Sequence, residues 1–311
     1  MPWYIIPVII IIFLGMVYII LSFGFAYIIL HPKRQPIAES PADFGLTYEQ
    51  IEFMNSDGLS LKGWFIPGPL NKLVIVTHPM WNNRHGYLTR NQSRLAAAKD
   101  DVHILLSIKA LNDAGYPVIT FDFRNHGESE GIGTPGCGLH EYKDVIAAMD
   151  YLNNNERFKS LDIGFVGFCM GANSMIIAMD KSKGLFDRVK CLVAIQPITL
   201  GVFVRSYLRN LYSFIGLLLF PMIRVFVRWQ GGDDINEMSP RKYVKGIQIP
   251  TLYVQTKTDP WTELSDIESF YAETPQTKEF WWMEEKMSRL QGYNYVGQHP
   301  DRIIQFLQSY L

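Results

Sequence analysis

The most constraining feature of the sequence is an uncharged segment at its N-terminus. Residues Trp3 to Leu30 read WYIIPVIIIIFLGMVYIILSFGFAYIIL and contain no charged side chain. A helix needs about 20 apolar residues to cross the hydrocarbon core of a bilayer. The segment therefore predicts a transmembrane helix, with Trp3, Tyr4 and Tyr27 near its ends, where aromatic side chains favour the membrane interface.

Two other interpretations of this segment are a cleaved signal peptide and a helix of the protein core. The run is longer than the hydrophobic region of a signal peptide, and no small-residue cleavage site follows it before HPKRQ. Lys33 and Arg34 come next, so the positive-inside rule places the rest of the chain on the cytoplasmic side. We expect a single-pass membrane protein with residues 1–31 as anchor and 32–45 as linker.

After the linker, short apolar runs alternate with helix-like segments. A hairpin comes first, because Asp57-Gly58 stands between two strand-like segments and supplies the positive φ of a tight turn. Helical patterns cover 140–154 and 300–311. The pattern predicts an α/β fold with a mostly parallel sheet and helices on both faces. The predicted buried strands are 72–77, 117–122, 161–167, 190–196, 250–256 and 278–284.

Composition narrows the classes of function. The 311 residues are 48% hydrophobic and 19% charged with a net charge of -1, which is typical of a globular chain without a basic surface for nucleic acid. Three cysteines, Cys137, Cys169 and Cys191, show no metal-ligand spacing and no disulfide framework. We expect no metal and no cofactor, and a reducing compartment fits best.

Cys169 lies in the segment GFCMG, residues 167–171, between a predicted strand and a predicted helix. Glycines two residues before and after a nucleophile relieve the crowding of the sharp turn called a nucleophile elbow. A helix N-terminus also favours the thiolate form of a cysteine. The alternative is a small buried cysteine that packs as a hydrophobe, which is our interpretation of Cys191. For Cys169 the pattern favours the nucleophile.

Two more segments support the interpretation of Cys169 as a nucleophile. VTHPMWNNRHGY follows the strand at 72–77, and FDFRNHGES follows the next strand. With GFCMG in this order, the chain from about Gly45 to Leu311 resembles the α/β-hydrolase superfamily, and its elbow cysteine is similar to that of dienelactone hydrolases. The resemblance implies an oxyanion hole from the backbones of Met80 and Met170 and a structural role for His126. It also implies a helical cap at 201–245 between core segments 46–200 and 246–311.

The resemblance implies an acid after the strand at 250–256, where Asp259 stands; an ordinary Asp-Pro turn is the alternative. It also implies a histidine in the loop directly after the last strand. The segment at 285–298 has none, and Ser288 stands where one is expected. His299 is the remaining candidate base, with a capping or surface role as its alternative.

The predicted cap contains Leu211 to Ile223, which is uncharged but too short to span a bilayer. One interpretation is an amphipathic segment in the lipid headgroup layer, and the other, which we favour, is an ordinary apolar cap over the site. A glycine-rich loop around Cys137, GIGTPGCGLH, is predicted to be a surface connection. The arginines that flank the uncharged stretch are Arg205, Arg209, Arg224 and Arg228.

Two functions stay open at this point. The first is a membrane-anchored hydrolase of an acyl ester or thioester, a lipidic one included, that uses Cys169, Asp259 and His299. The second is a catalytically inactive hydrolase fold that serves as a binding or assembly subunit with protein partners in a membrane complex. Both place a lipid bilayer among the partners, and neither involves nucleic acid.

Overall fold

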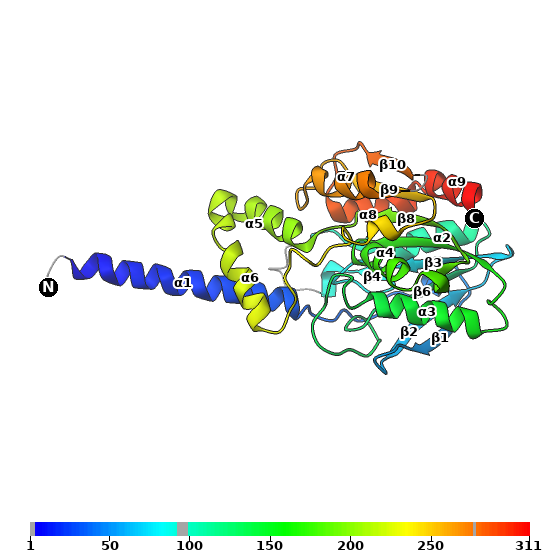
Figure 1. Cartoon of the computed structure of the whole chain (residues 1–311), viewed down its shortest axis with the longest axis horizontal. Coiled ribbons are helices and arrows are strands. Elements are labelled where there is room, and N and C mark those ends of the chain that lie inside the picture. Colours follow the sequence, from blue (N-terminus) through cyan, green and yellow to red (C-terminus); the bar gives the residue numbers. More distant parts are fainter. Residues whose placement is uncertain (1–3, 92–98, 276–277) are drawn as a thin grey trace.

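The computed structural model describes residues 4–91, 99–275 and 278–311 (Figure 1). Within these residues, eight strands form one sheet in the order β1-β2-β6-β3-β7-β8-β9-β10. Two short strands, β4 (Gly86–Tyr87) and β5 (Val102–His103), pair separately. The strands of the large sheet are β1 (Glu49–Met54), β2 (Ser60–Ile66), β3 (Lys72–Thr77), β6 (Val118–Phe121), β7 (Asp162–Phe168), β8 (Val189–Ile195), β9 (Thr251–Thr256) and β10 (Lys278–Met283).

Strand direction follows the sequence pattern. β1 and β2 form the predicted antiparallel hairpin, and Gly58 in its turn has a φ of 76°. β2 pairs antiparallel with β6, and the pairings from β6 through β3, β7, β8 and β9 to β10 are parallel. All six predicted parallel strands are present, with ends that differ by at most one residue. Their apolar side chains are buried because helices cover both faces of the sheet, except in the edge strand β10, where Phe280, Trp281 and Trp282 are half-buried.

Helices on the two faces pack in pairs. On one face α3 contacts α4, and on the other α2 contacts α8, while α9 lies against β8 (Figure 1). α4 begins directly after β7 and therefore carries the elbow. The helices of the body are α2 (Ile104–Asp113), α3 (Tyr142–Asn154), α4 (Met170–Lys181), α7 (Leu264–Glu273), α8 (Arg289–Gln298) and α9 (Asp301–Tyr310).

Two local predictions were wrong. The segment after β10, predicted as a loop, contains α8, because Ser288 caps its N-terminus: the Ser288 hydroxyl accepts from the Gln291 N–H at 3.1 Å, and the Gln291 side chain bonds back. The loop around Cys137 is exposed only at residues 131–133; residues 134–138 are buried, and Cys137 is buried completely. The Asn173 side chain donates to the Cys137 carbonyl at 3.0 Å and holds the loop against α4.

The N-terminal helix α1 (Ile5–Leu30) extends away from the body (Figure 1). It is long and apolar enough to cross a membrane, and a signal sequence can have the same length and apolar composition. Trp3, predicted to lie at the interface, is outside the described residues. α1 packs against α6, and one side of its C-terminal turns is buried, at Ser22, Ala26, Ile29 and Leu30.

Between β8 and β9 the chain forms α5 (Leu200–Leu217) and α6 (Phe220–Trp229), which are bent by 108° relative to each other. Tyr212 and Ser213 have non-helical backbone angles and kink α5. Pro221 lies in the first turn of α6, where its missing N–H costs no helical hydrogen bond.

Candidate functional site

Cys169 stands at the turn between β7 and α4 with φ 51° and ψ -112°. This backbone conformation is strained for a residue with a side chain, and such strain collects at functional sites. Its N–H donates to the Ile195 carbonyl at 2.8 Å, which fixes the turn to the end of β8. A Cβ on Gly167 would lie 2.6 Å from the Ala172 backbone, and one on Gly171 would lie 2.4 Å from the Thr77 hydroxyl. Both glycines are therefore required by the tight turn.

Met80 and Met170 lie at the same edge of the sheet as Cys169. Thr77, the last residue of β3, is in register with Gly167 of β7, so the segment that carries Met80 begins beside the elbow. Met170 is the first residue of α4, where a helix offers no internal acceptor for the N–H. The predicted oxyanion donors thus come from two neighbouring strand ends, as an acyl-transfer site needs.

Asp259 follows β9, and its carboxylate is fully buried. It accepts from the Trp261 N–H at 2.9 Å, and its partner on the other side is Arg289, whose Nη1 lies 2.7 Å from Asp259 Oδ2. Arg289 is the first residue of α8 and its side chain is 2% exposed. The structure thus places a guanidinium against Asp259, where the sequence analysis expected an imidazole.

Tyr293 connects this ion pair to Cys169. Arg289 Nε donates to the Tyr293 hydroxyl at 2.8 Å, and Cys169 is close enough to Tyr293 to contribute to raising the pKa of its hydroxyl. Tyr293 stands one helical turn after Arg289, so both side chains project from the same face of α8. Its ring also meets Phe168 edge-on at 5.7 Å. The result is a continuous chain of contacts from Asp259 through Arg289 and Tyr293 to the thiol.

The charge states of Tyr293 and Arg289 follow from their burial and their neighbours. Burial raises the pKa of Tyr293 well above its usual value, and nearby Cys169 and Asp259 add to the effect while Arg289 opposes it. Burial alone would lower the pKa of Arg289, but Tyr293, Cys169 and Asp259 together raise it well above its usual range. At neutral pH the site therefore holds a neutral phenol and a permanent cation beside Cys169.

His299 lies outside the group formed by Asp259, Arg289, Tyr293 and Cys169. It caps the C-terminal end of α8, about 15 Å along the helix axis from Arg289 at 1.5 Å per residue. Its N–H donates to the Tyr295 carbonyl at 2.8 Å, its ring lies against Tyr295 at 4.3 Å, and its side chain is exposed. Helix α8 begins at Arg289 and keeps its far end away from the elbow, so the structure does not bring His299 to Cys169.

The remaining histidines have other partners. His78 accepts from the Phe123 N–H at 3.1 Å, and its ring lies 5.1 Å from His126. His126 Nδ1 bonds the Arg124 carbonyl at 2.8 Å, as its expected structural role requires, and burial lowers the pKa of both rings. Each of His31, His85, His103 and His140 also bonds other groups.

An aromatic cluster lies beside the site. Phe203 of α5 contacts Trp81, Tyr207 and Trp261, and the Arg289 guanidinium lies 5.8 Å from the Phe203 ring. Cys169 is only 5% exposed. Trp81 has a φ of 67°, so the segment after β3 is strained as well.

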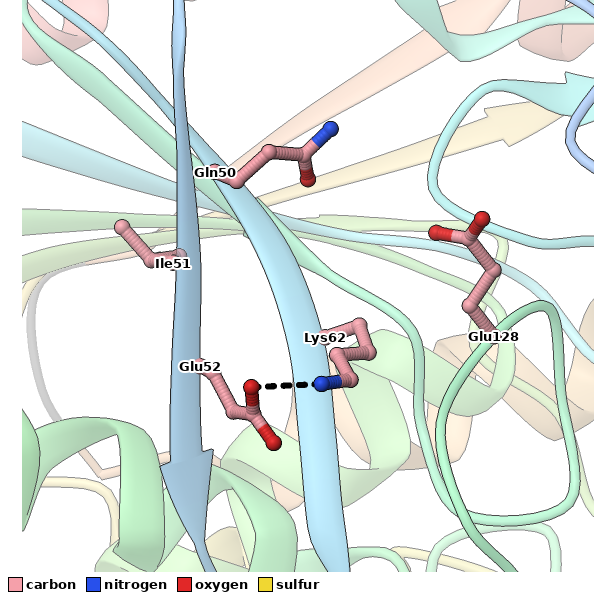
Figure 2. Close-up of a pocket in the computed structure, with 5 residues that line it drawn as sticks. All are labelled: Gln50, Ile51, Glu52, Lys62 and Glu128. Carbon is pink, nitrogen blue, oxygen red and sulfur yellow. Dashed lines mark ion pairs between the residues drawn. The ribbon is translucent and has the colours of Figure 1, made fainter.

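Cys137 is the second thiol near the site. Burial and the neighbouring Cys169 raise its pKa well above the usual value, so it stays protonated. A separate open depression of about 470 Å³ lies on the outer strands β1 and β2 and is bordered by the ion pair of Glu52 with Lys62 (Figure 2). It contains none of the predicted site residues and lies on the antiparallel edge of the sheet, away from the strand ends that carry Cys169.

Sequence reasoning missed Arg289 and Tyr293. A signal for them was present, because Ser288 and Gln291 have the spacing of a capping box and so predict a helix that starts at Arg289. Within such a helix, residues 289 and 293 share one face. Nothing in the sequence shows that this face meets Asp259, since that contact depends on how α8 packs.

Comparison with known proteins agrees with this architecture. The sequence profile of the α/β hydrolase fold matches residues 95–218. YqkD of Bacillus subtilis, an uncharacterized protein, is 28% identical over 174 residues, and the match covers 55% of this chain but only 56% of YqkD. YfhR of Salmonella typhi, also uncharacterized, is 26% identical over 90% of this chain and 87% of its own length.

Two further similar proteins carry functional names. Thiohydrolase aneE of Aspergillus aculeatus is 25% identical over 50% of this chain and 44% of its own length. The solved structure of the Pyrococcus furiosus esterase Pf2001 superposes with a TM-score of 0.67 at 24% identity, over 90% of this chain and 99% of the esterase.

Proposed function

The chain has the α/β-hydrolase fold, and from this premise we propose that it is a membrane-anchored ester or thioester hydrolase with Cys169 as nucleophile. The observation that carries the proposal is the strained elbow conformation of Cys169 at the turn from β7 into α4. The names of two similar proteins, an esterase and a thiohydrolase, support the reaction class. The acid is Asp259, acting through Arg289.

The reaction begins with a Cys169 thiolate, which Arg289 and the Tyr293 hydroxyl stabilise. The sulfur attacks the acyl carbonyl, a C–S bond forms, and the negative carbonyl oxygen is held by the N–H groups of Met80 and Met170. The bond to the leaving group then breaks; an alkoxide takes the Tyr293 proton, which solvent replaces, whereas a thiolate leaves as the anion and is protonated by solvent. Arg289 stabilises the transient phenolate, so this proton transfer requires no imidazole.

Deacylation is the slower half of this reaction. Water must attack the acyl carbon, so that a C–O bond forms and the C–S bond breaks to release the acid and the Cys169 thiolate, and a histidine usually takes the proton of that water. Tyr293 keeps its proton at neutral pH, so it is a poor base for this step. We therefore expect slow turnover, with hydroxide as the attacking species.

The membrane anchor belongs to the same proposal. Helix α1 spans the bilayer, and Lys33 and Arg34 keep the body on the cytoplasmic side. A lipidic acyl substrate fits this location.

Intact-mass spectrometry of the purified full-length chain during incubation with a short activated acyl ester tests the catalytic proposal. We expect one acyl group per chain, which clears slowly as free acid accumulates, and no adduct on the Cys169→Ala variant. The second candidate function, a catalytically inactive membrane subunit, is favoured by the distance of His299 from Cys169. It would be supported by the absence of any adduct on the unmodified chain.

A further inference from the structure

The α5–α6 bend carries a group of large apolar side chains that point to solvent. Phe214 is 70% exposed, Leu218 62% and Trp229 73%. Such a group on a folded surface marks a contact with a membrane or a partner. The other exposed members are Leu211, Tyr212, Ile215 and Val225. We call the segment Leu211–Leu218 the cap tip.

Contacts with α1 fix the position of the cap tip along that helix. The Tyr18 hydroxyl donates to the Leu218 carbonyl at 3.1 Å. Closer to the body, Phe25 meets Tyr212 at 6.2 Å between ring centres. The cap tip therefore lies beside the C-terminal half of the apolar helix, as the ribbon also shows (Figure 1). α6 crosses α1 next to the cap tip, with Phe226 and Trp229 against Phe23 (Figure 1).

The length of α1 determines how deep the cap tip would lie in the bilayer. Its 26 residues measure about 39 Å at 1.5 Å per residue, while the hydrocarbon core is about 30 Å thick. With Ile5 at the far boundary, the near boundary falls close to Phe25. Tyr18 precedes Phe25 by seven residues, and its level is about 10 Å inside. That depth matches the roughly 5–10 Å to which interfacial helices bury their apolar face.

The charges of α6 agree with this placement. Arg224 Nη2 lies 2.5 Å from Asp234 Oδ2, and Arg228 reaches the same carboxylate at 3.1 Å. Asp234 follows Gly232, which packs against Leu30 at the body end of α1. Both arginines therefore extend away from the cap tip toward the interface, as long basic side chains do near a membrane boundary.

We propose that the cap tip inserts into the bilayer leaflet that adjoins the body and that it contacts lipid directly. The proposal rests on the membrane anchor of the proposed function and adds a second membrane contact. It also connects lipid to the site, because α5 runs from the cap tip to Phe203, beside Arg289. A lipidic acyl chain would reach Cys169 along this helix and under the aromatic cluster.

Spin labelling of the full-length chain in phosphatidylcholine nanodiscs tests the inference. A nitroxide is attached to Ile215→Cys in the cap tip, to Ile12→Cys in α1 as a lipid control and to Met54→Cys on the body as a water control. All three sites are exposed, so the substitutions leave the core intact. The native cysteines are buried, and the unmodified chain measures their background labelling. Collision rates with oxygen and with a water-soluble nickel complex then report the surroundings of each label.

We expect the Ile215 label to resemble the Ile12 label, with oxygen collisions at least several-fold more favoured than at Met54. An Ile215 label as open to nickel as the Met54 label, with Ile12 in lipid, would overturn this inference alone and would assign the cap tip to a protein partner. An Ile12 label open to nickel would overturn both this inference and the membrane anchor.

Discussion

The half of the candidate site around Cys169 agrees with the expected acyl-transfer site, and the half that follows β10 differs from it. On the nucleophile side, β7, Cys169 and α4 form the sharp turn that an acyl-transfer site requires, with glycines at both positions where a Cβ would collide. On the opposite side, after β10, helix α8 presents Arg289 and Tyr293 where the fold usually has a histidine. In the proposed active site the elbow is thus present while Arg289 and Tyr293 stand where the resemblance predicts a histidine, and the proposed chemistry depends on both halves.

The largest expected effect concerns the thiol itself. Cys169→Ser keeps the elbow but supplies a hydroxyl, which needs a base to become a nucleophile. With Arg289 and Tyr293 beside it, we expect acylation to fall by roughly a thousand-fold or more. Stopped-flow release of the alcohol from an activated ester measures this. A serine variant with near-normal activity would show that a base is present and would break the contrast between the two halves.

The next effect concerns the buried ion pair. Arg289→Met leaves the Asp259 carboxylate buried without its partner, so the free energy of unfolding should fall by about 3–5 kcal/mol. Adding Asp259→Leu removes the orphaned charge, and we expect much of that stability to return while activity stays lost. Urea unfolding of the body, followed by tryptophan fluorescence, provides the measurement. Equal loss in the single and double variants would mean that the pair is not coupled.

A smaller effect is expected in the pH dependence of deacylation. An imidazole base gives a rate that rises to a plateau above about pH 6.5. Here burial raises the pKa of Tyr293, so the phenol stays protonated and the rate should keep rising from about pH 6 to pH 9 as hydroxide increases. Clearance of a preformed adduct, followed by mass spectrometry, shows which profile holds. A plateau near neutral pH would point to an imidazole.

The difference between the halves also explains what could be predicted from the sequence. The strands and the elbow are local features: buried runs, glycine spacing and a strand-to-helix turn each lie within a few neighbouring residues. Arg289 and Asp259 are 30 residues apart and meet only because β9 and β10 are adjacent and α8 folds back over them. An imidazole was expected from the resemblance, and no local pattern indicates that a guanidinium replaces it.

The cap also shows that packing between distant segments cannot be predicted from local sequence patterns. The sequence leaves two interpretations of Leu211 to Ile223, of which an ordinary cap over the site is the favoured one. The structure has features of both, since Phe203 at one end of α5 lies beside Arg289 and Phe214 near the other end is exposed beside α1. The packing of α6 on α1 decides which face is free, and it depends on residues about 200 positions apart.

The central claim is that Tyr293 with Arg289, and not His299, serves Cys169. It is tested most directly by the rate of acyl-adduct formation in two variants, Tyr293→Phe and His299→Gln. Tyr293→Phe keeps the ring against Phe168 and removes only the hydroxyl, and we predict a fall of about 10- to 100-fold. His299→Gln should leave the rate unchanged. A normal rate in Tyr293→Phe together with a large loss in His299→Gln would contradict the account.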